Sequence, residues 1–146
     1  MNSHDPAPTT AYLVLRLHPG AGTMRTDIVR REASGEETLV HSHQSPPGKF
    51  GIEDFKRAVA PLVEGGLRRA IIDLVEVRWA PSEVIENLLV IESYLREGGV
   101  ATVVARPNSR VSSVLTITGL MRLMEVCESL EEAIASLGPG KDAASS

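Results

Sequence analysis

The first candidate for chemistry in this sequence is Ser82, the hydroxyl residue of the segment Pro81-Ser82-Glu83. Proline suits the first position of a helix, because the N–H that it lacks would have no partner there. Glu83 then falls in the first helical turn, where negative charge is favoured. A phosphate on Ser82 would lie at the positive end of the helix dipole and would add about −2 charge beside Glu83 and Glu86. The alternative is that Ser82 only helps to start the helix.

A second candidate is Asp73, which interrupts an apolar run at residues 70–75. A carboxylate in a buried strand needs hydrogen-bond donors or a cationic partner. Asp73 could act as a general acid or base. The sequence favours the other interpretation, in which it is a structural acceptor that holds a neighbouring loop.

Two histidines and the single cysteine also carry side chains with metal-binding or nucleophilic chemistry. His41 and His43 share one face of an expected strand, so their imidazoles could hold a metal. No cysteine, aspartate or third histidine stands near them in the sequence, and solvated polar residues on an exposed strand are the favoured interpretation. Cys127 lies beside an apolar run and is expected to be a small core residue rather than a nucleophile. We therefore predict no metal and no cofactor.

Sequence motifs of common enzyme classes are absent. There is no Walker-type glycine loop, no G-x-G-x-x-G between a strand and a helix, and no G-x-S-x-G elbow. An enzyme that uses Asp73 or Glu83 as acid or base is a disfavoured third possibility. The sequence predicts that the protein is not an enzyme and has no catalytic residue.

A strand–helix–strand unit in the middle of the chain must position these residues. Apolar runs at residues 70–75 and 100–105 are typical of parallel strands that are buried on both faces. Between them, apolar residues recur at helical spacing, and Gly98-Gly99 follows the last turn. The stripe consists of Val84, Ile85, Leu88, Ile91 and Leu95. This order predicts a right-handed βαβ unit with Ser82 at the junction between strand and helix.

Further elements are expected on both sides of this unit. Before it we expect three strands and a helix, at residues 12–17, 26–32, 38–43 and 52–64, the second and third strands forming an exposed hairpin. After it we expect a helix, a strand or extended segment and a second helix, at residues 109–117, 121–126 and 130–137. The chain should form a single domain at residues 11–138, with disordered tails at residues 1–10 and 139–146.

Composition excludes several classes of partner. The chain has 146 residues, of which 42% are hydrophobic and 3% aromatic, so its core must consist of aliphatic side chains. The formal charge of −4 gives no general attraction to nucleic acid or to an anionic membrane. No apolar stretch approaches the roughly 20 residues that span a bilayer, and the first residues do not form a secretory signal. A single cysteine fits a reducing cytosol, so a cytoplasmic location is expected.

Several segments match the pattern of one known family. They are DLVEV at residues 73–77, PSEVI at 81–85, REGG at 96–99, VLTITGL at 114–120 and SLEEA at 129–133. Together they resemble the STAS domain, the fold of bacterial anti-sigma-factor antagonists, in which a buried strand is followed by a D-S-[ST]-G-L segment at a helix start. Ser82 falls on the serine that partner kinases phosphorylate in that family.

The loop departs from the family signature at three residues around Ser82. Pro81 replaces the acidic residue that is expected to help phosphorylation, Glu83 replaces a hydroxyl residue, and Val84 replaces the glycine. Glu83 could keep the loop permanently negative. The buried strands and the later G-L segment still match, so the resemblance implies the fold.

The resemblance implies an α/β, STAS-like mixed sheet with helices packed mainly on one face, to which residues 12–17 would add an N-terminal strand. It also implies a non-catalytic protein-binding module in bacterial signalling, possible partners being an anti-sigma factor with a kinase-type ATP-binding fold or another STAS protein. The expected partner-binding residues are Lys49, Phe50, Arg78, Trp79, Pro81, Ser82, Glu83 and Glu86, with Ser82 as the phosphorylation candidate. The alternative is a constitutive scaffold without a switch, which forms homodimers or larger assemblies through the hairpin and the N-terminal strand.

Overall fold

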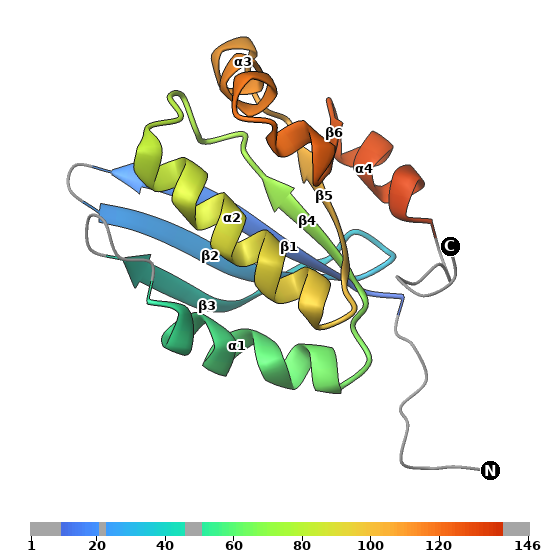
Figure 1. The fold of residues 1–146 in the computed structure, drawn as a ribbon. Helices are drawn as coiled ribbons and strands as arrows, with labels where there is room; N and C mark the ends of the chain where they lie inside the picture. Colours follow the sequence, from blue (N-terminus) through green and yellow to red (C-terminus); the bar gives the residue numbers. More distant parts are fainter. Residues whose placement is uncertain (1–9, 21–22, 46–50, 139–146) are drawn as a thin grey trace.

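The protein has an α/β fold, and its described residues form a six-stranded mixed sheet and four α-helices (Figure 1). The computed structural model describes residues 10–20, 23–45 and 51–138. The strands are β1 (Tyr12–Gly20), β2 (Thr23–Arg31), β3 (Glu37–Ser45), β4 (Arg69–Asp73), β5 (Ala101–Ala105) and β6 (Glu125–Cys127). The helices are α1 (Ile52–Glu64), α2 (Ser82–Glu97), α3 (Ser109–Ile117) and α4 (Leu130–Leu137), with a 3₁₀ turn η1 (Leu120–Arg122). Apart from Thr10, the predicted tails lie outside the described residues.

The sheet combines an antiparallel half with a parallel half. Its strand order is β3-β2-β1-β4-β5-β6. β1, β2 and β3 form an antiparallel meander, whereas β1, β4, β5 and β6 run parallel. The predicted βαβ unit is therefore confirmed as β4-α2-β5, and all four parallel strands present their carboxyl ends at the same edge of the sheet.

The N-terminal strand is central, and the prediction that it offers an edge for self-association is wrong. One side of β1 pairs with β2, as in Tyr12↔Arg31, and the other pairs with β4, as in Leu13↔Ala70. Side chains on both faces of β1 are fully buried, for example those of Val14 and Leu15. The free edges of the sheet are β3 and β6.

Helices cover mainly one face of the sheet, as predicted. Alternate residues of β1 and β4 pack against α1, α2 and α3 in the larger core, whose members include Leu15, Phe55 and Ile91. The intervening residues form a smaller core on the other face, where Val14, Ile71 and others pack against α4, the one described helix in that core. Figure 1 shows α1 and α2 on the near side of the sheet and α4 beside β5 and β6.

Two local predictions need correction. β2 and β3 form the predicted hairpin, but only β3 is exposed, because β2 lies between β1 and β3 and buries Thr26 and Ile28. The predicted strand at residues 121–126 begins instead as η1, since Gly119 adopts φ 80 and the next residues close short turns. Only Glu125–Cys127 pairs with β5. The helix predicted at residues 52–64 is confirmed with both bounds, and Pro61 lies inside it.

Candidate partner-binding site

Ser82 is the first residue of α2, just beyond the carboxyl end of the fully buried strand β4. Pro81 is the N-cap residue, in an extended conformation (φ −67, ψ 172), so the helix starts one residue later than predicted. The Pro81 carbonyl accepts the N–H of Val84 at 3.0 Å and that of Ile85 at 3.2 Å. No side chain in the described part of the protein caps this end, so none there competes with an anion on Ser82 for the first N–H groups of α2.

Packing of α2 fixes where the Ser82 hydroxyl lies. The stripe that includes Val84, Leu88 and Ile91 is fully buried against the sheet. Ser82 and Glu83 are exposed at the end of the helix, and so is Glu86 one turn later. The geometry therefore places a solvent-accessible hydroxyl at a helix start, with two carboxylate residues on the same helix end.

The loop between β4 and α2 is held by Asn108 from a different part of the chain. Asn108 Nδ2 donates to the carbonyl of Arg78 at 3.1 Å and to that of Val77 at 3.4 Å. Asn108 Oδ1 accepts the N–H of Val111 at 2.8 Å and so caps α3. One side chain thus fixes both the loop and the start of α3, which brings the two helix starts together.

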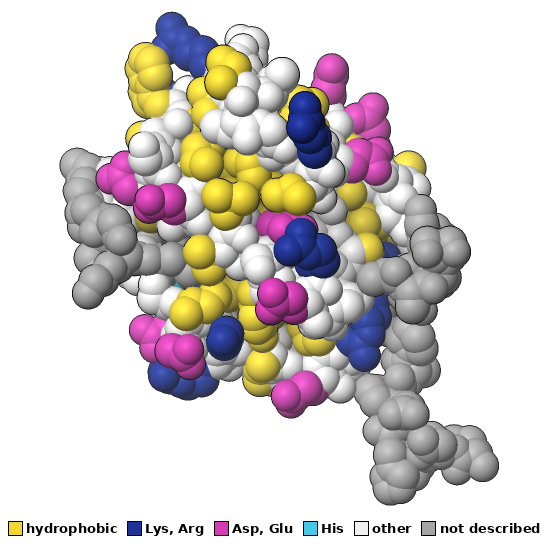
Figure 2. Space-filling model, viewed as in Figure 1, with side chains coloured by type: hydrophobic (Ala, Val, Ile, Leu, Met, Phe, Trp, Pro, Cys, Tyr) yellow, Lys and Arg dark blue, Asp and Glu magenta, His cyan; other side chains and the backbone are white. Residues whose placement is uncertain are grey.

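An exposed tryptophan lies on this loop. Trp79 is 63% exposed, and the guanidinium of Arg110 in α3 lies 4.4 Å from the centroid of its ring. Arg78 is exposed beside it. In Figure 2, hydrophobic and basic side chains lie together at the end of the molecule where α2 begins, and acidic side chains lie over the first part of α2. Six predicted residues are therefore close together here: Arg78, Trp79, Pro81, Ser82, Glu83 and Glu86.

Asp73, the last residue of β4, holds the start of this loop through hydrogen bonds. Its side chain is 0% exposed and accepts hydrogen bonds from Arg16 Nε at 2.8 Å and from Arg106 Nη2 at 2.6 Å. Asp73 Oδ1 also accepts the N–H of Val75 at 3.2 Å, which turns the chain out of β4. Burial alone would raise the pKa of Asp73, but the bonds from Arg106 and Arg16 outweigh it and hold that pKa below its usual range. This arrangement supports the structural interpretation of Asp73.

Arg106 reaches Asp73 through an unusual backbone conformation. Its φ is 60, in the left-handed region that residues other than glycine rarely adopt. An extended residue after Ala105 would point to the opposite face of the sheet, away from Asp73. The backbone is held in place by the N–H of Arg106, which donates to the carbonyl of Cys127 at 2.9 Å. The strained conformation therefore serves the ion pair.

The same network extends across the sheet face that α4 leaves open. Both terminal nitrogens of Arg16 donate to Glu37, at 2.8 and 2.9 Å, and Arg31 donates to Glu37 at 2.7 Å. The hydrogen bonds from Arg16 and Arg31 lower the pKa of Glu37 to about 2. Arg16 therefore joins β3 to β4 through two carboxylates.

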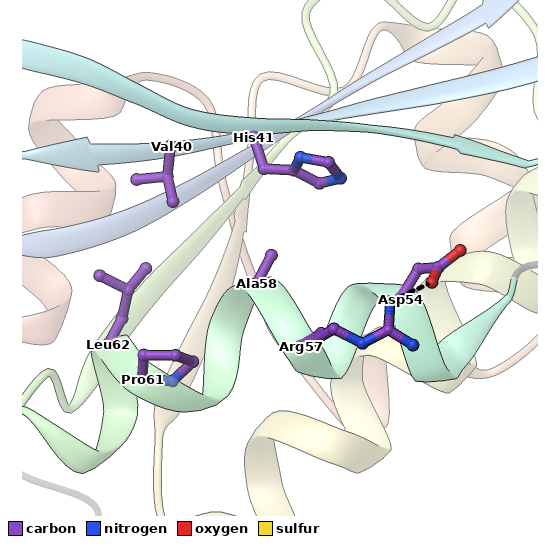
Figure 3. A pocket seen from close by; sticks show the side chains of 7 residues that line it. All are labelled: Val40, His41, Asp54, Arg57, Ala58, Pro61 and Leu62. Atoms are coloured by element: carbon purple, nitrogen blue, oxygen red, sulfur yellow. Dashed lines mark hydrogen bonds and ion pairs between the residues drawn. The ribbon is translucent and has the colours of Figure 1, made fainter.

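The two histidines of β3 occupy different environments. His43 is buried and meets Phe55 edge to face, with ring centroids 6.1 Å apart, whereas His41 is exposed. His41 lines a groove of about 620 Å³ between β3 and α1, where it faces Asp54 and Ala58 (Figure 3). The described residues contain no group of three or more His, Cys, Asp or Glu side chains that could hold a metal.

The remaining sequence predictions concern Cys127, Lys49 and Phe50. Cys127 is buried in the smaller core, as expected, and burial raises the pKa of its thiol. Lys49 and Phe50, predicted to contact a partner, lie outside the described residues. Asn108 and Arg110 were not predicted as part of the site. Because loops that follow neighbouring parallel strands meet at one edge of the sheet, the expected order β4-α2-β5 was the signal that could have found them.

Comparisons with known proteins leave the family open. No family model matches the chain, and no solved structure matches it. A 2-hydroxy-6-oxononadienedioate/2-hydroxy-6-oxononatrienedioate hydrolase of Klebsiella pneumoniae is 37% identical over 73 residues. That match covers 50% of this chain but only 24% of the hydrolase. No described helix has the length and apolar character that crossing a membrane requires.

Proposed function

We propose that this protein is a non-catalytic, protein-binding module of bacterial signalling, similar to an anti-sigma-factor antagonist and switched by phosphorylation of Ser82. The observation that carries the proposal is the position of Ser82, exposed as the first residue of α2 beside a loop that presents Trp79. The proposed partner is an anti-sigma factor of the kinase-type ATP-binding fold or another STAS protein. The proposed site of action is the cytoplasm.

The switch is electrostatic. Unmodified Ser82 is neutral, and a phosphate would add about −2 charge where Glu83 and Glu86 already lie on the same helix end. The N–H groups of the first helical turn would hold the phosphate in place rather than let it turn away. A partner whose contacts include carboxylates near Ser82 would be repelled, and losing a buried charged contact costs about 2–5 kcal/mol of binding free energy.

The test compares three tagged baits in cells of the source organism: the wild type, Ser82→Ala and Ser82→Asp. Captured proteins are identified by mass spectrometry, and the affinity of each identified partner is then measured with purified proteins. We expect a kinase-fold or STAS partner to bind the wild type and Ser82→Ala equally, and to be lost with Ser82→Asp. Ser34→Asp, at an exposed serine in the turn between β2 and β3, is the matched control. Equal binding of Ser82→Asp and Ser34→Asp would refute the switch.

A second candidate is a constitutive scaffold that self-associates through β3. This strand is a free edge of the sheet, and its Leu39 and Val40 are 59% and 40% exposed. Long edge strands without lysine or proline are ready to pair with another strand. We expect light scattering to show a concentration-dependent dimer that Leu39→Lys abolishes if this function is the correct one. A monomer at all concentrations would exclude it.

A further inference from the structure

We propose that Arg78, Trp79 and Arg110 form one docking surface, here called the Trp79 corner, which takes an acidic segment of a partner protein. In this arrangement Trp79 is the apolar anchor, and the two arginines contact carboxylates of that segment. The inference rests on the proposed function, because it gives the partner chemistry of the same site.

The first support is the geometry of Trp79. A tryptophan that is 63% exposed leaves a large apolar surface in water, and tryptophan and arginine are among the residues that dominate binding energies at interfaces. The central carbon of the Arg110 guanidinium lies over the ring, 4.4 Å from its centroid. A cation–π contact does not require the N–H donors of the guanidinium, so Arg110 can still bind a carboxylate through them.

The second support is charge. Neither Arg78 nor Arg110 forms an ion pair within the described part of the chain. Most other arginines there are already paired with a carboxylate: Arg16, Arg25, Arg30, Arg31, Arg57, Arg96 and Arg106. In a chain of formal charge −4, two unpaired cations beside one exposed aromatic ring make a local complement for an acidic segment.

The third support is rigidity. Asn108 holds the carbonyls of Val77 and Arg78 and caps α3, which carries Arg110. The corner is therefore formed before a partner arrives, and binding loses less conformational entropy than a free loop would.

The position of Ser82 suggests how phosphorylation would affect binding at the Trp79 corner. It follows Trp79 by one short segment, so a phosphate there would place negative charge beside the incoming acidic segment. Glu83 and Glu86 already make this side of the corner unfavourable for long polyanions such as nucleic acid or an anionic membrane. A short segment with few carboxylates and an apolar residue fits better.

The experiment uses the full chain as bait for a random peptide library displayed on phage. We expect the enriched peptides to be acidic and to carry an apolar residue. The affinity of a synthetic, fluorescent copy is then measured by anisotropy at low and at high salt. We expect Arg78→Ala/Arg110→Ala and Trp79→Ala each to weaken it by at least about tenfold, and salt to weaken binding to the wild type.

Lys56→Ala/Arg57→Ala on α1 removes the same charge elsewhere and is the matched control, expected to change affinity by less than about twofold. Because Trp79, Arg78 and Arg110 are exposed, the variants should melt with the wild type. Enrichment of peptides that are not acidic, or binding that survives in Arg78→Ala/Arg110→Ala, would overturn the inference. The inference would also be overturned if the Trp79 corner bound single-stranded DNA or phosphatidylserine vesicles and no acidic peptide.

The two proposals can fail separately. If the acidic peptide requires Arg78 and Arg110 but binds the wild type and Ser82→Asp equally, the Trp79 corner stands and the phosphorylation switch falls. If the captured natural partner is lost with Ser82→Asp yet binds Arg78→Ala/Arg110→Ala as tightly as the wild type, the switch stands and the corner falls.

Discussion

Replacing Asp73 with asparagine tests whether the ion-pair network holds the base of the site. The side chain is 0% exposed and accepts four hydrogen bonds, one from Arg16, two from Arg106 and one from the Val75 N–H. Removing one partner of a buried ion pair costs about 3–5 kcal/mol of unfolding free energy. Arg16 and Arg106 keep 21% and 33% side-chain exposure and can be rehydrated, so we expect the lower limit, about 3 kcal/mol. The melting temperature should fall by roughly 10 °C.

The cost should depend on pH in a defined direction. The pKa of Asp73 is lower in the folded protein than the value of about 3.9 for an unfolded chain. Such a group stabilises the fold fully above the unfolded pKa, and the contribution is lost as pH falls through the folded pKa. Asparagine does not titrate. The difference between wild type and Asp73→Asn should therefore be constant near neutral pH and shrink below about pH 4.

Urea unfolding followed by circular dichroism, at neutral pH and in acid, measures both effects. Asp54→Asn is the matched control, because its carboxylate also pairs with an arginine but is 64% exposed. We expect this control to cost less than about 0.5 kcal/mol. If Asp73→Asn cost no more than Asp54→Asn at neutral pH, or if its cost were the same in acid, the network would not be what holds this loop.

Substitutions at three further residues test other parts of the structure. Thr26→Val should raise the free energy of unfolding, measured by urea titration, by about 1 kcal/mol, because the fully buried Thr26 hydroxyl has no hydrogen-bond partner among the described residues. A loss of stability would contradict this. Asn108→Ala should cost about 1 kcal/mol, whereas Asn108→Asp should keep the helix cap and lose only the donation to the loop. Hydrogen exchange near Arg78 should then quicken in both variants, and unchanged exchange would refute the contact. Glu37→Gln should destabilise the protein at neutral pH and not near pH 2, since the folded Glu37 has a pKa of about 2; a cost unchanged by acid would count against its ion pairs.

Local patterns were sufficient for the elements around Ser82. Apolar runs and a helical stripe predicted β4, α2 and β5, and the bounds of α1 were predicted without error. These signals are local because a buried strand or helix face repeats within a few residues. The exposure of Trp79 and Ser82 follows from the same logic, since both belong to the connection rather than to the buried elements.

The remainder of the site depends on contacts between distant segments. No local pattern shows that Arg16 and Arg106 converge on Asp73, or that Arg106 adopts a left-handed backbone to do so. The sequence indicates that Asn108 can cap a helix. Its donation to the carbonyl of Arg78 depends on which loop lies beside it in the fold. The central place of β1 was missed for the same reason, because strand pairing is decided by the whole sheet.

The position of β1 has a consequence for how this chain reaches its structure. The antiparallel meander is complete once β3 has been synthesised, but one edge of β1 has no partner until β4 follows, and Arg16 meets Asp73 only 57 residues later. During that interval a nascent chain exposes an apolar strand edge, the kind of template on which wrong pairing and aggregation begin. Both halves of the sheet must therefore assemble on β1, so the sheet cannot be completed until β4, in the middle of the chain, has been synthesised.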